Sequence, residues 1–137
     1  MRPELSQVMM GVATMISSRS SCSRRKVGCV ITDSSMSQIY SIGYNGNYRG
    51  GPNDCDRTQA GNCGCLHAED NALVKLRTEA HNLRLFTTLS PCMACAKRII
   101  NQGHIRSVYY SHEYRDTSPL DILIMDGITL EYHNDSH

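Results

Sequence analysis

Two stretches decide how this chain folds and which metal it binds: His67-Ala68-Glu69 and Pro91-Cys92-Met93-Ala94-Cys95. Together they offer one imidazole and two thiolates, which are ligands that zinc prefers. Structural zinc sites are usually closed by four protein ligands, whereas catalytic sites keep one position for water or substrate. These ligands therefore predict a catalytic zinc, with Glu69 beside it as an unligated carrier of protons.

Both stretches are predicted to open helices. Pro91 suits a first helical turn, and Ser90 suits the capping position before it. Cys92 and Cys95 are three residues apart, so they share one side of that turn. If His67 opens a second helix and both helices pack on one sheet, the three ligands converge. The positive ends of the helix dipoles then also favour thiolates.

Periodic patterns on either side of these stretches predict a mixed sheet. Apolar residues at helical spacing predict helices over residues 4–18, 67–80, 91–102 and 120–125. Runs rich in β-branched and aromatic residues predict strands over residues 27–32, 39–44, 83–89, 105–110 and 128–132. The first two strands read as an antiparallel hairpin. The alternation that follows predicts parallel strands with right-handed crossovers.

Length and charge limit the class of protein. The 137 residues predict a single domain over 1–137. The 14 Lys and Arg residues nearly balance the 13 Asp and Glu residues, so we expect no nucleic-acid partner. No apolar run approaches the roughly 20 residues of a membrane span, and no basic-then-apolar leader is visible. We therefore expect a soluble cytoplasmic protein with no membrane partner.

The seven cysteines favour metal binding, because clustered cysteines in a reducing compartment more often hold metal than form disulfides. Cys29 lies alone in an apolar run and is expected to be buried without chemistry. Four cysteines remain after the catalytic ligands are assigned: Cys22, Cys55, Cys63 and Cys65. They predict a second, closed structural zinc that ties down the loop over residues 45–66, with Asp54 as an alternative to Cys55.

His-x-Glu combined with Pro-Cys-x-x-Cys is the signature of the zinc nucleobase deaminases. In that chemistry zinc lowers the pKa of its water to about 7, which supplies a nucleophile for C4 of a cytosine ring. Glu69 would take the proton of the water, pass it to N3 and help the amino group leave as ammonia. We expect the N–H of Ala68 to meet the base carbonyl and the carbonyl of Ser90 to meet the amino group. A redox Cys-x-x-Cys is the alternative, disfavoured because no thioredoxin-like unit precedes Pro91.

The same stretches and others along the chain carry a family resemblance: Cys22–Gly28, Gly43-Tyr44-Asn45-Gly46, His67–Ala72, Thr88–Ala96, Tyr110, Tyr114, Asp121-Ile122-Leu123 and Gly127-Ile128. In these the chain resembles the deoxycytidylate (dCMP) deaminases of the phage and bacterial type. The resemblance implies a three-layer α/β/α cytidine-deaminase-like fold with a five-stranded mixed sheet. It also implies hydrolysis of dCMP to dUMP for dTMP synthesis, a homohexamer, and a place in the host cytoplasm for a phage-encoded member. Activation by dCTP with Mg²⁺ and inhibition by dTTP are implied as well.

The chain departs from the family pattern in the loop after Gly-Tyr-Asn-Gly. Tyr48 stands where the family usually has proline. If that loop shapes a regulatory site, the response to dCTP depends on this residue. The segment between the loop and His67 is also short, so an insertion found in some members is missing.

The resemblance also suggests residues that bind the sugar and the phosphate. Asn45 resembles the family residue that binds the sugar hydroxyl, and an amide that both donates and accepts suits a 3′-hydroxyl. Its alternative is a turn-forming Asn beside a glycine. Arg24 and Lys26 are our choice for the 5′-phosphate from the run Arg24-Arg25-Lys26, because cationic donors match phosphate oxygens. The alternative for that run is a solvated basic loop.

Two tyrosines complete the predicted pocket. Tyr110 and Tyr114 are expected to line it near the base or the phosphate, although a tyrosine in a core strand is equally ordinary. Three other functions compete with a dCMP deaminase. One is a zinc deaminase of tRNA adenosine or a free base, which the Gly-Tyr-Asn-Gly loop disfavours. The others are a non-catalytic zinc- or nucleotide-binding module, which has no use for Glu69, and a nucleotide sensor with minor catalysis.

Overall fold

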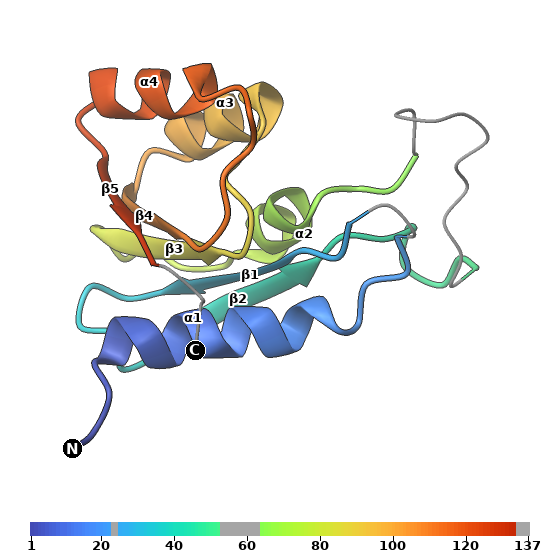
Figure 1. Ribbon diagram of the computed structural model, residues 1–137, viewed down its shortest axis with the longest axis horizontal. Helices are drawn as coiled ribbons and strands as arrows, with labels where there is room; N and C mark the ends of the chain where they lie inside the picture. Colours follow the sequence, from blue (N-terminus) through green and yellow to red (C-terminus); the bar gives the residue numbers. More distant parts are fainter. Residues whose placement is uncertain (23–24, 53–63, 134–137) are drawn as a thin grey trace.

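The computed structural model describes residues 1–22, 25–52 and 64–133 (Figure 1). Its helices are α1 (Leu5–Ser17), α2 (Ala68–Lys75), α3 (Met93–Gln102) and α4 (Ser118–Met125). Its strands are β1 (Gly28–Thr32), β2 (Ile39–Tyr44), β3 (Leu83–Thr87), β4 (Ile105–Tyr110) and β5 (Thr129–Tyr132). None of the helices within the described ranges is both long and apolar enough to cross a bilayer.

The strands of the described residues form one mixed sheet in the order β2-β1-β3-β4-β5. β1 runs antiparallel to both β2 and β3, while β3, β4 and β5 are parallel to one another. The antiparallel hairpin and the parallel second half are therefore both confirmed. The parallel strands direct their carboxyl ends to one edge of the sheet, where the segments that enter α3 and α4 begin.

The helices cover the sheet from both sides (Figure 1). α1 packs against β1, β2 and β3 over a cluster that includes Met10, Ala13, Val30 and Phe86. α2, α3 and α4 cover the opposite face over a larger cluster centred on Ile31, Leu85, Ile99 and Leu123. Because β3, β4 and β5 follow one another in the same direction, two right-handed crossovers place α3 and α4 on one face. The three-layer α/β/α arrangement is confirmed.

Gly43 allows α2 to lie directly on β2. A Cβ at this position would meet the backbone oxygen of Ala68 at 2.2 Å and the backbone nitrogen of Ala72 at 2.6 Å. These distances are too short for any side chain, so the glycine sets how closely the helix approaches. The contact fixes the first turn of α2, which carries His67 and Glu69.

The predicted helix over residues 67–80 was too long, because α2 ends at Lys75. Leu76 takes an extended conformation, with φ −65° and ψ 125°. The Arg77 guanidinium then donates to the backbone oxygens of Val74 and Leu76. The Arg77 side chain thus binds carbonyls that a continued helix would have paired with backbone N–H groups. The apolar residues beyond Lys75 still pack on the core, but without helical structure.

The Gly43-Tyr44-Asn45-Gly46 segment is more regular than its composition predicts. Gly46 and Leu66 form an isolated antiparallel bridge, with backbone N···O distances of 3.0 and 2.7 Å. The bridge fixes the chain immediately before His67. An ion pair between Asp70 and Arg98, with an N···O distance of 3.1 Å, links α2 to α3 on the other side.

We predict that Gly43→Ala lowers the free energy of unfolding by about 3 kcal/mol, at the upper end of overpacking effects, since backbone atoms must move. Gly11→Ala is the control, because Gly11 lies inside α1 with no atom within 4 Å of a built Cβ. That change is expected to stabilise the protein by up to ~1 kcal/mol through helix propensity. Urea unfolding measures both, and equal effects of the two substitutions would refute the role given to Gly43.

Candidate active site

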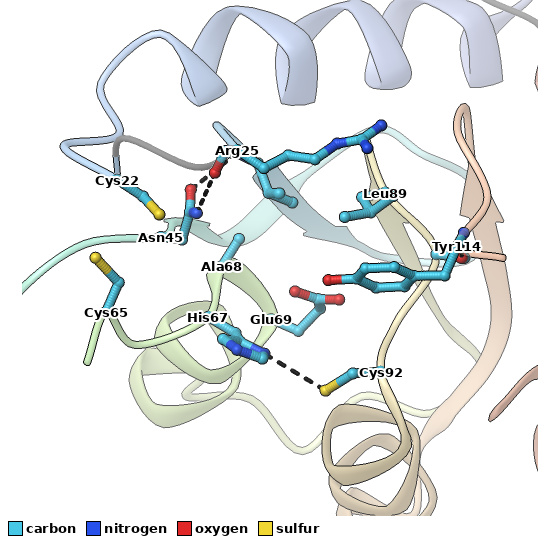
Figure 2. Close-up of a pocket in the computed structure, with 12 residues that line it drawn as sticks. Cys22, Arg25, Asn45, Cys65, His67, Ala68, Glu69, Leu89, Cys92 and Tyr114 are labelled. Carbon is cyan, nitrogen blue, oxygen red and sulfur yellow. Dashed lines mark hydrogen bonds between the residues drawn. The ribbon is translucent and has the colours of Figure 1, made fainter. Parts of the chain in front are cut away.

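Three metal-binding side chains converge where α2 and α3 begin. His67 is the N-cap residue of α2 and Cys92 that of α3, while Cys95 lies in the first turn of α3. The Nδ1 atom of His67 lies 3.3 Å from Cys95 Sγ and 3.5 Å from Cys92 Sγ. All three ligand atoms fall within 4.8 Å of one another. Figure 2 shows the imidazole of His67 pointing toward the Cys92 thiol.

The spacing of these donors fits a tetrahedral zinc. Zn–N bonds of about 2.0 Å and Zn–S bonds of about 2.3 Å place a nitrogen and a sulfur ligand of a tetrahedral site about 3.5 Å apart. The N···S distances of 3.3 and 3.5 Å are close to that edge length. The chemistry of one imidazole and two thiolates also matches a three-ligand zinc site that keeps a position for substrate. His67, Cys92 and Cys95 are therefore the residues that would hold zinc.

Before any metal binds, the surroundings of Cys92 already favour its negatively charged thiolate form. Hydrogen bonds from Cys95 and His67 lower the pKa of the Cys92 thiol to about 3. The pKa of Cys95 is raised because Cys95 keeps the proton that it donates to Cys92 and because its side chain is buried. The hydrogen bond to Cys92 raises the pKa of His67 despite partial burial. Cys95 and His67 thus both retain protons that a bound divalent cation would displace.

Glu69 lies in the first turn of α2 and is only 4% exposed. Figure 2 shows its carboxylate pointing into the cavity between the His67 and Tyr114 rings. Burial raises the pKa of Glu69 to about 7, partly offset by a hydrogen bond from its own backbone N–H and by His67. A carboxyl group whose pKa lies near neutrality can both accept and return a proton, which suits a proton shuttle.

A cavity of about 470 Å³ opens beside these groups and is large enough for a nucleotide. Its described lining consists of Cys22, Arg25, Val27, Asn45, Cys65, His67, Ala68, Glu69, Leu89, Ser90, Cys92 and Tyr114. The apolar part of this wall comes from Val27 and Leu89, which were assigned from sequence to strands alone. Leu89 follows the carboxyl end of β3, and Val27 precedes the antiparallel β1 at the same edge of the sheet. This position was the signal that sequence reasoning missed, because the carboxyl ends of parallel strands are where α/β proteins bind ligands.

Asn45 lines the cavity but also holds neighbouring backbone. Its Oδ1 accepts from the N–H of Val27 at 2.8 Å, and its Nδ2 donates to the carbonyl of Arg25 at 2.5 Å. These two bonds use one acceptor position and one N–H of an amide that has two of each. The predicted sugar contact and a structural role therefore fall on the same side chain.

The two described residues of the run Arg24-Arg25-Lys26 line different cavities. Arg25 lines the main cavity, whereas Lys26 lines a smaller cavity of about 150 Å³ beside it, which Arg25 also borders. Arg24 lies outside the described residues. Sequence reasoning favoured the two neighbours of Arg25, because nothing in the run distinguishes which side chain turns inward.

The segment before α3 also differs from its prediction. Ser90 and Pro91 precede the helix and Cys92 caps it, so Ser90 is not the N-cap. The Ser90 hydroxyl oxygen instead accepts from the backbone N–H of Tyr114 at 2.9 Å. This bond ties the two loops at the carboxyl ends of β3 and β4 together, and it brings the Tyr114 ring to the cavity (Figure 2).

Tyr110 does not line the described part of the cavity. It packs in the core cluster at 8% exposure, and its hydroxyl donates to Glu113 at 3.5 Å. Of the four cysteines assigned to a second zinc, Cys22 and Cys65 both line the cavity, and Figure 2 shows both side chains at the same end of it. Cys55 and Cys63 lie outside the described residues.

The site therefore has a buried carboxylate beside an imidazole–dithiolate cluster, at the strand ends of the mixed sheet in a three-layer fold. This is the arrangement of the zinc-dependent nucleobase deaminases. The model of the cytidine and deoxycytidylate deaminase zinc-binding region matches residues 3–112. The chain belongs to this family.

Individual relatives agree with that assignment. A crystal structure of dCMP deaminase from the cyanophage S-TIM5 in complex with dCMP and dUMP is 36% identical, with a TM-score of 0.85, and the match covers 97% of this chain and 99% of that one. The deoxycytidylate deaminase of Mycobacterium phage D29 is 33% identical over 79% of this chain and 95% of its own length. The deoxycytidylate deaminase of Saccharomyces cerevisiae is 37% identical over 95% of this chain, which spans only 45% of the yeast protein.

We predict that Cys92→Ala lowers the zinc content of the purified protein by one equivalent, because two protein ligands rarely retain zinc. Cys29→Ala is the matched control: Cys29 is fully buried in β1 and is not part of the ligand cluster. Its zinc content should equal that of the unsubstituted protein. Inductively coupled plasma mass spectrometry gives the count, and full zinc retention by Cys92→Ala would contradict the ligand assignment.

Proposed function

We propose that this chain hydrolyses dCMP to dUMP and ammonia as a single zinc-dependent domain. The observation that carries the proposal is the placement of Glu69 against the His67–Cys92–Cys95 cluster inside a nucleotide-sized cavity. The dCMP deaminase of cyanophage S-TIM5 supports the choice of substrate, because its structure in complex with dCMP and dUMP matches nearly the whole of both chains.

The proposed reaction adds water to C4 of the cytosine ring and releases the amino group. Zinc held by His67, Cys92 and Cys95 would supply a Lewis acid that activates water at neutral pH. Glu69 accepts a proton from the attacking water and delivers a proton to N3 of the ring. Glu69 then takes the remaining proton from the new C4 hydroxyl and transfers it to the amino nitrogen, the C4–N bond breaks as the C4 carbonyl forms, and water and dCMP give dUMP and ammonia in balance.

Backbone groups orient the base in this proposal. Ala68 is the first residue of α2, and its N–H is among those that the helix leaves unpaired, so it would donate to the base carbonyl. The carbonyl of Ser90 would accept from the amino group. Asn45 would bind the sugar, while Tyr114, Leu89 and Val27 would exclude water from the ring.

We predict that Glu69→Gln keeps zinc and fold but lowers kcat by about 10³-fold or more, because general acid–base catalysis by one group contributes about 10²–10⁴. Asp126→Asn is the control. Asp126 does not line the cavity, and its ion pair with Arg106 is a partly exposed interaction of small energy, so kcat should stay within a few-fold. Spectrophotometric assay of dCMP turnover decides, and an active Glu69→Gln would rule out the mechanism.

The choice of substrate is tested by parallel assays of dCMP, CMP, deoxycytidine and cytosine. Strong turnover of dCMP alone is expected. Turnover of adenosine in RNA without turnover of dCMP would favour the rival tRNA deaminase, and zinc binding without any turnover would favour a non-catalytic module.

A second, structural zinc is part of the proposal. Cys22 and Cys65 line the same rim of the cavity, which is consistent with a shared site that also includes Cys55 and Cys63. Two zinc ions per chain are expected, and Cys65→Ser should remove one while the His67–Cys92–Cys95 ion stays. A count of one zinc in the fully active protein would dispose of the second site.

We also propose the quaternary and regulatory properties implied by the family resemblance: a cytoplasmic homohexamer that is activated by dCTP·Mg²⁺ and inhibited by dTTP. Tyr48 is 63% exposed in the loop after β2, and its ring lies against Gly51, where a Cβ would meet it at 2.8 Å. Light scattering gives the subunit count. Initial rates at low dCMP should rise with dCTP·Mg²⁺ and fall with dTTP, and rates that ignore both would remove regulation from the account.

A further inference from the structure

Two successive pairs of side chains link α2 to α3. The first pair belongs to the ligand cluster, with 3.3 Å between Nδ1 of His67 and Sγ of Cys95. The second is the ion pair between Asp70 and Arg98, with an N···O distance of 3.1 Å. Asp70 follows His67 by three residues, and Arg98 follows Cys95 by three, so each helix carries both side chains on one side. The ion pair therefore repeats the contact between the ligands one turn further along both helices.

Asp70 is the more buried member of this ion pair. Its side chain is 19% exposed, whereas that of Arg98 is 56% exposed. The Oδ1 atom of Asp70 is shielded from water, and among the described residues it has no aligned hydrogen bond, although the Arg98 guanidinium lies beside it. A buried oxygen without an aligned donor raises the free energy of the fold, and a nearby positive charge offsets part of that cost. Asp70 therefore favours a position of α3 that keeps Arg98 close.

The remaining contact between the two helices restrains their separation weakly. The side chains that they bury include three alanines, Ala68 and Ala72 on α2 and Ala96 on α3. A methyl group buries little apolar area, so it contributes little to holding two helices together. Within the described parts of α2 and α3, the Asp70–Arg98 ion pair is the polar link between the helices outside the ligand cluster.

The negative charge of Asp70 also reaches the ligand cluster. Hydrogen bonds with Cys92 do most to raise the pKa values of His67 and Cys95, and the charge of Asp70 adds to both increases. Asp70 could therefore favour a bound cation in two ways, by its charge or by holding the helices together. The two ways predict opposite effects of losing Arg98. Loss of its positive charge would strengthen the attraction for a cation, whereas loss of the ion pair would loosen the helices.

We propose that the Asp70–Arg98 ion pair positions the zinc ligands by holding the first turn of α2 against that of α3. His67 then lies at binding distance from Cys92 and Cys95 before metal arrives, and ligands that are already in place bind more tightly. Asp70 and Arg98 are positioning residues, because they act through the ligands. The inference deepens the proposed function and rests on its zinc site, but it does not depend on the identity of the substrate.

The test measures zinc affinity by competition with a chromophoric chelator, in a Cys65→Ser background so that only the ligand cluster is counted. Asp70→Asn and Arg98→Gln are each expected to weaken zinc binding about 5-fold, near the upper limit for a partly exposed ion pair. The double variant Asp70→Asn/Arg98→Gln should bind no more weakly than either single variant, because both remove the same contact. Arg98→Lys keeps a cation beside Asp70 and should retain most of the affinity.

The matched control is the ion pair of Arg106 with Asp126, which has an N···O distance of 3.3 Å and side chains that are 38% and 39% exposed. It joins β4 to the end of α4, and neither residue lines the cavity or belongs to the ligand cluster. Arg106→Gln and Asp126→Asn should leave zinc affinity unchanged. Urea unfolding of the metal-free proteins shows how much stability each variant loses, which separates a general loss of stability from a loss of ligand positioning.

Four outcomes would overturn the proposal. Zinc affinity that is unchanged or raised in Arg98→Gln would leave Asp70 only the effect of its charge. Unchanged affinity in Asp70→Asn would remove the ion pair from zinc binding. Additive losses in the double variant would show that the two residues act separately, and an equal loss in Arg106→Gln would show an effect of stability alone. If the Cys65→Ser protein itself binds no zinc, the zinc site of the proposed function is wrong, which is a distinct result.

Discussion

The close contact between α2 and β2 at Gly43 is the constraint on which the site depends. It allows the first turn of α2 to lie on the sheet, with backbone atoms where any other residue would carry a side chain. His67 and Glu69 belong to that turn, so a helix displaced outward would carry one metal ligand and the proton carrier away from Cys92 and Cys95. The Gly46–Leu66 bridge and the Asp70–Arg98 ion pair hold the same helix at its start and along its side.

Burial then decides what these residues can do. Glu69 is almost fully enclosed, and the cost of desolvating its charge brings its pKa close to neutrality. Cys92, by contrast, is stabilised as a thiolate by hydrogen bonds from its neighbours. A carboxyl group that exchanges protons and a thiolate that attracts a cation therefore stand side by side, although both are acids. Their different environments follow from where α2 and α3 begin on the sheet.

The sequence was most informative where chemistry depends on local spacing. The ligand cluster was predicted because Cys92 and Cys95 share one helical turn and His67 precedes Glu69 by two residues. The mixed sheet was predicted because strand and helix periods alternate. Local capping rules failed at Ser90, since its hydroxyl bonds to Tyr114, 24 residues away. The helix predicted over residues 67–80 was too long. The observed helix ends at Lys75, where the Arg77 side chain donates to nearby backbone carbonyls, and helical spacing alone gives no sign of this.

Long-range contacts account for what the sequence left open. Arg24, Arg25 and Lys26 are all basic. Of the two that the structure describes, Arg25 lines the main cavity, and Asn45, 20 positions further on, donates to its backbone carbonyl. Tyr110 and Tyr114 are four residues apart, yet one packs in the core and the other faces the cavity, because the parallel strand ends between them. Such choices are made by tertiary structure, and a single sequence carries no local signal for them.

The most direct test of the account is to strip the protein of metal, restore zinc in steps and follow dUMP and ammonia formation from dCMP at each step. The account predicts no turnover in the metal-free protein and a rise in rate that tracks occupancy of the His67–Cys92–Cys95 cluster. Full turnover without metal, or zinc-loaded protein that leaves dCMP unchanged, would contradict it.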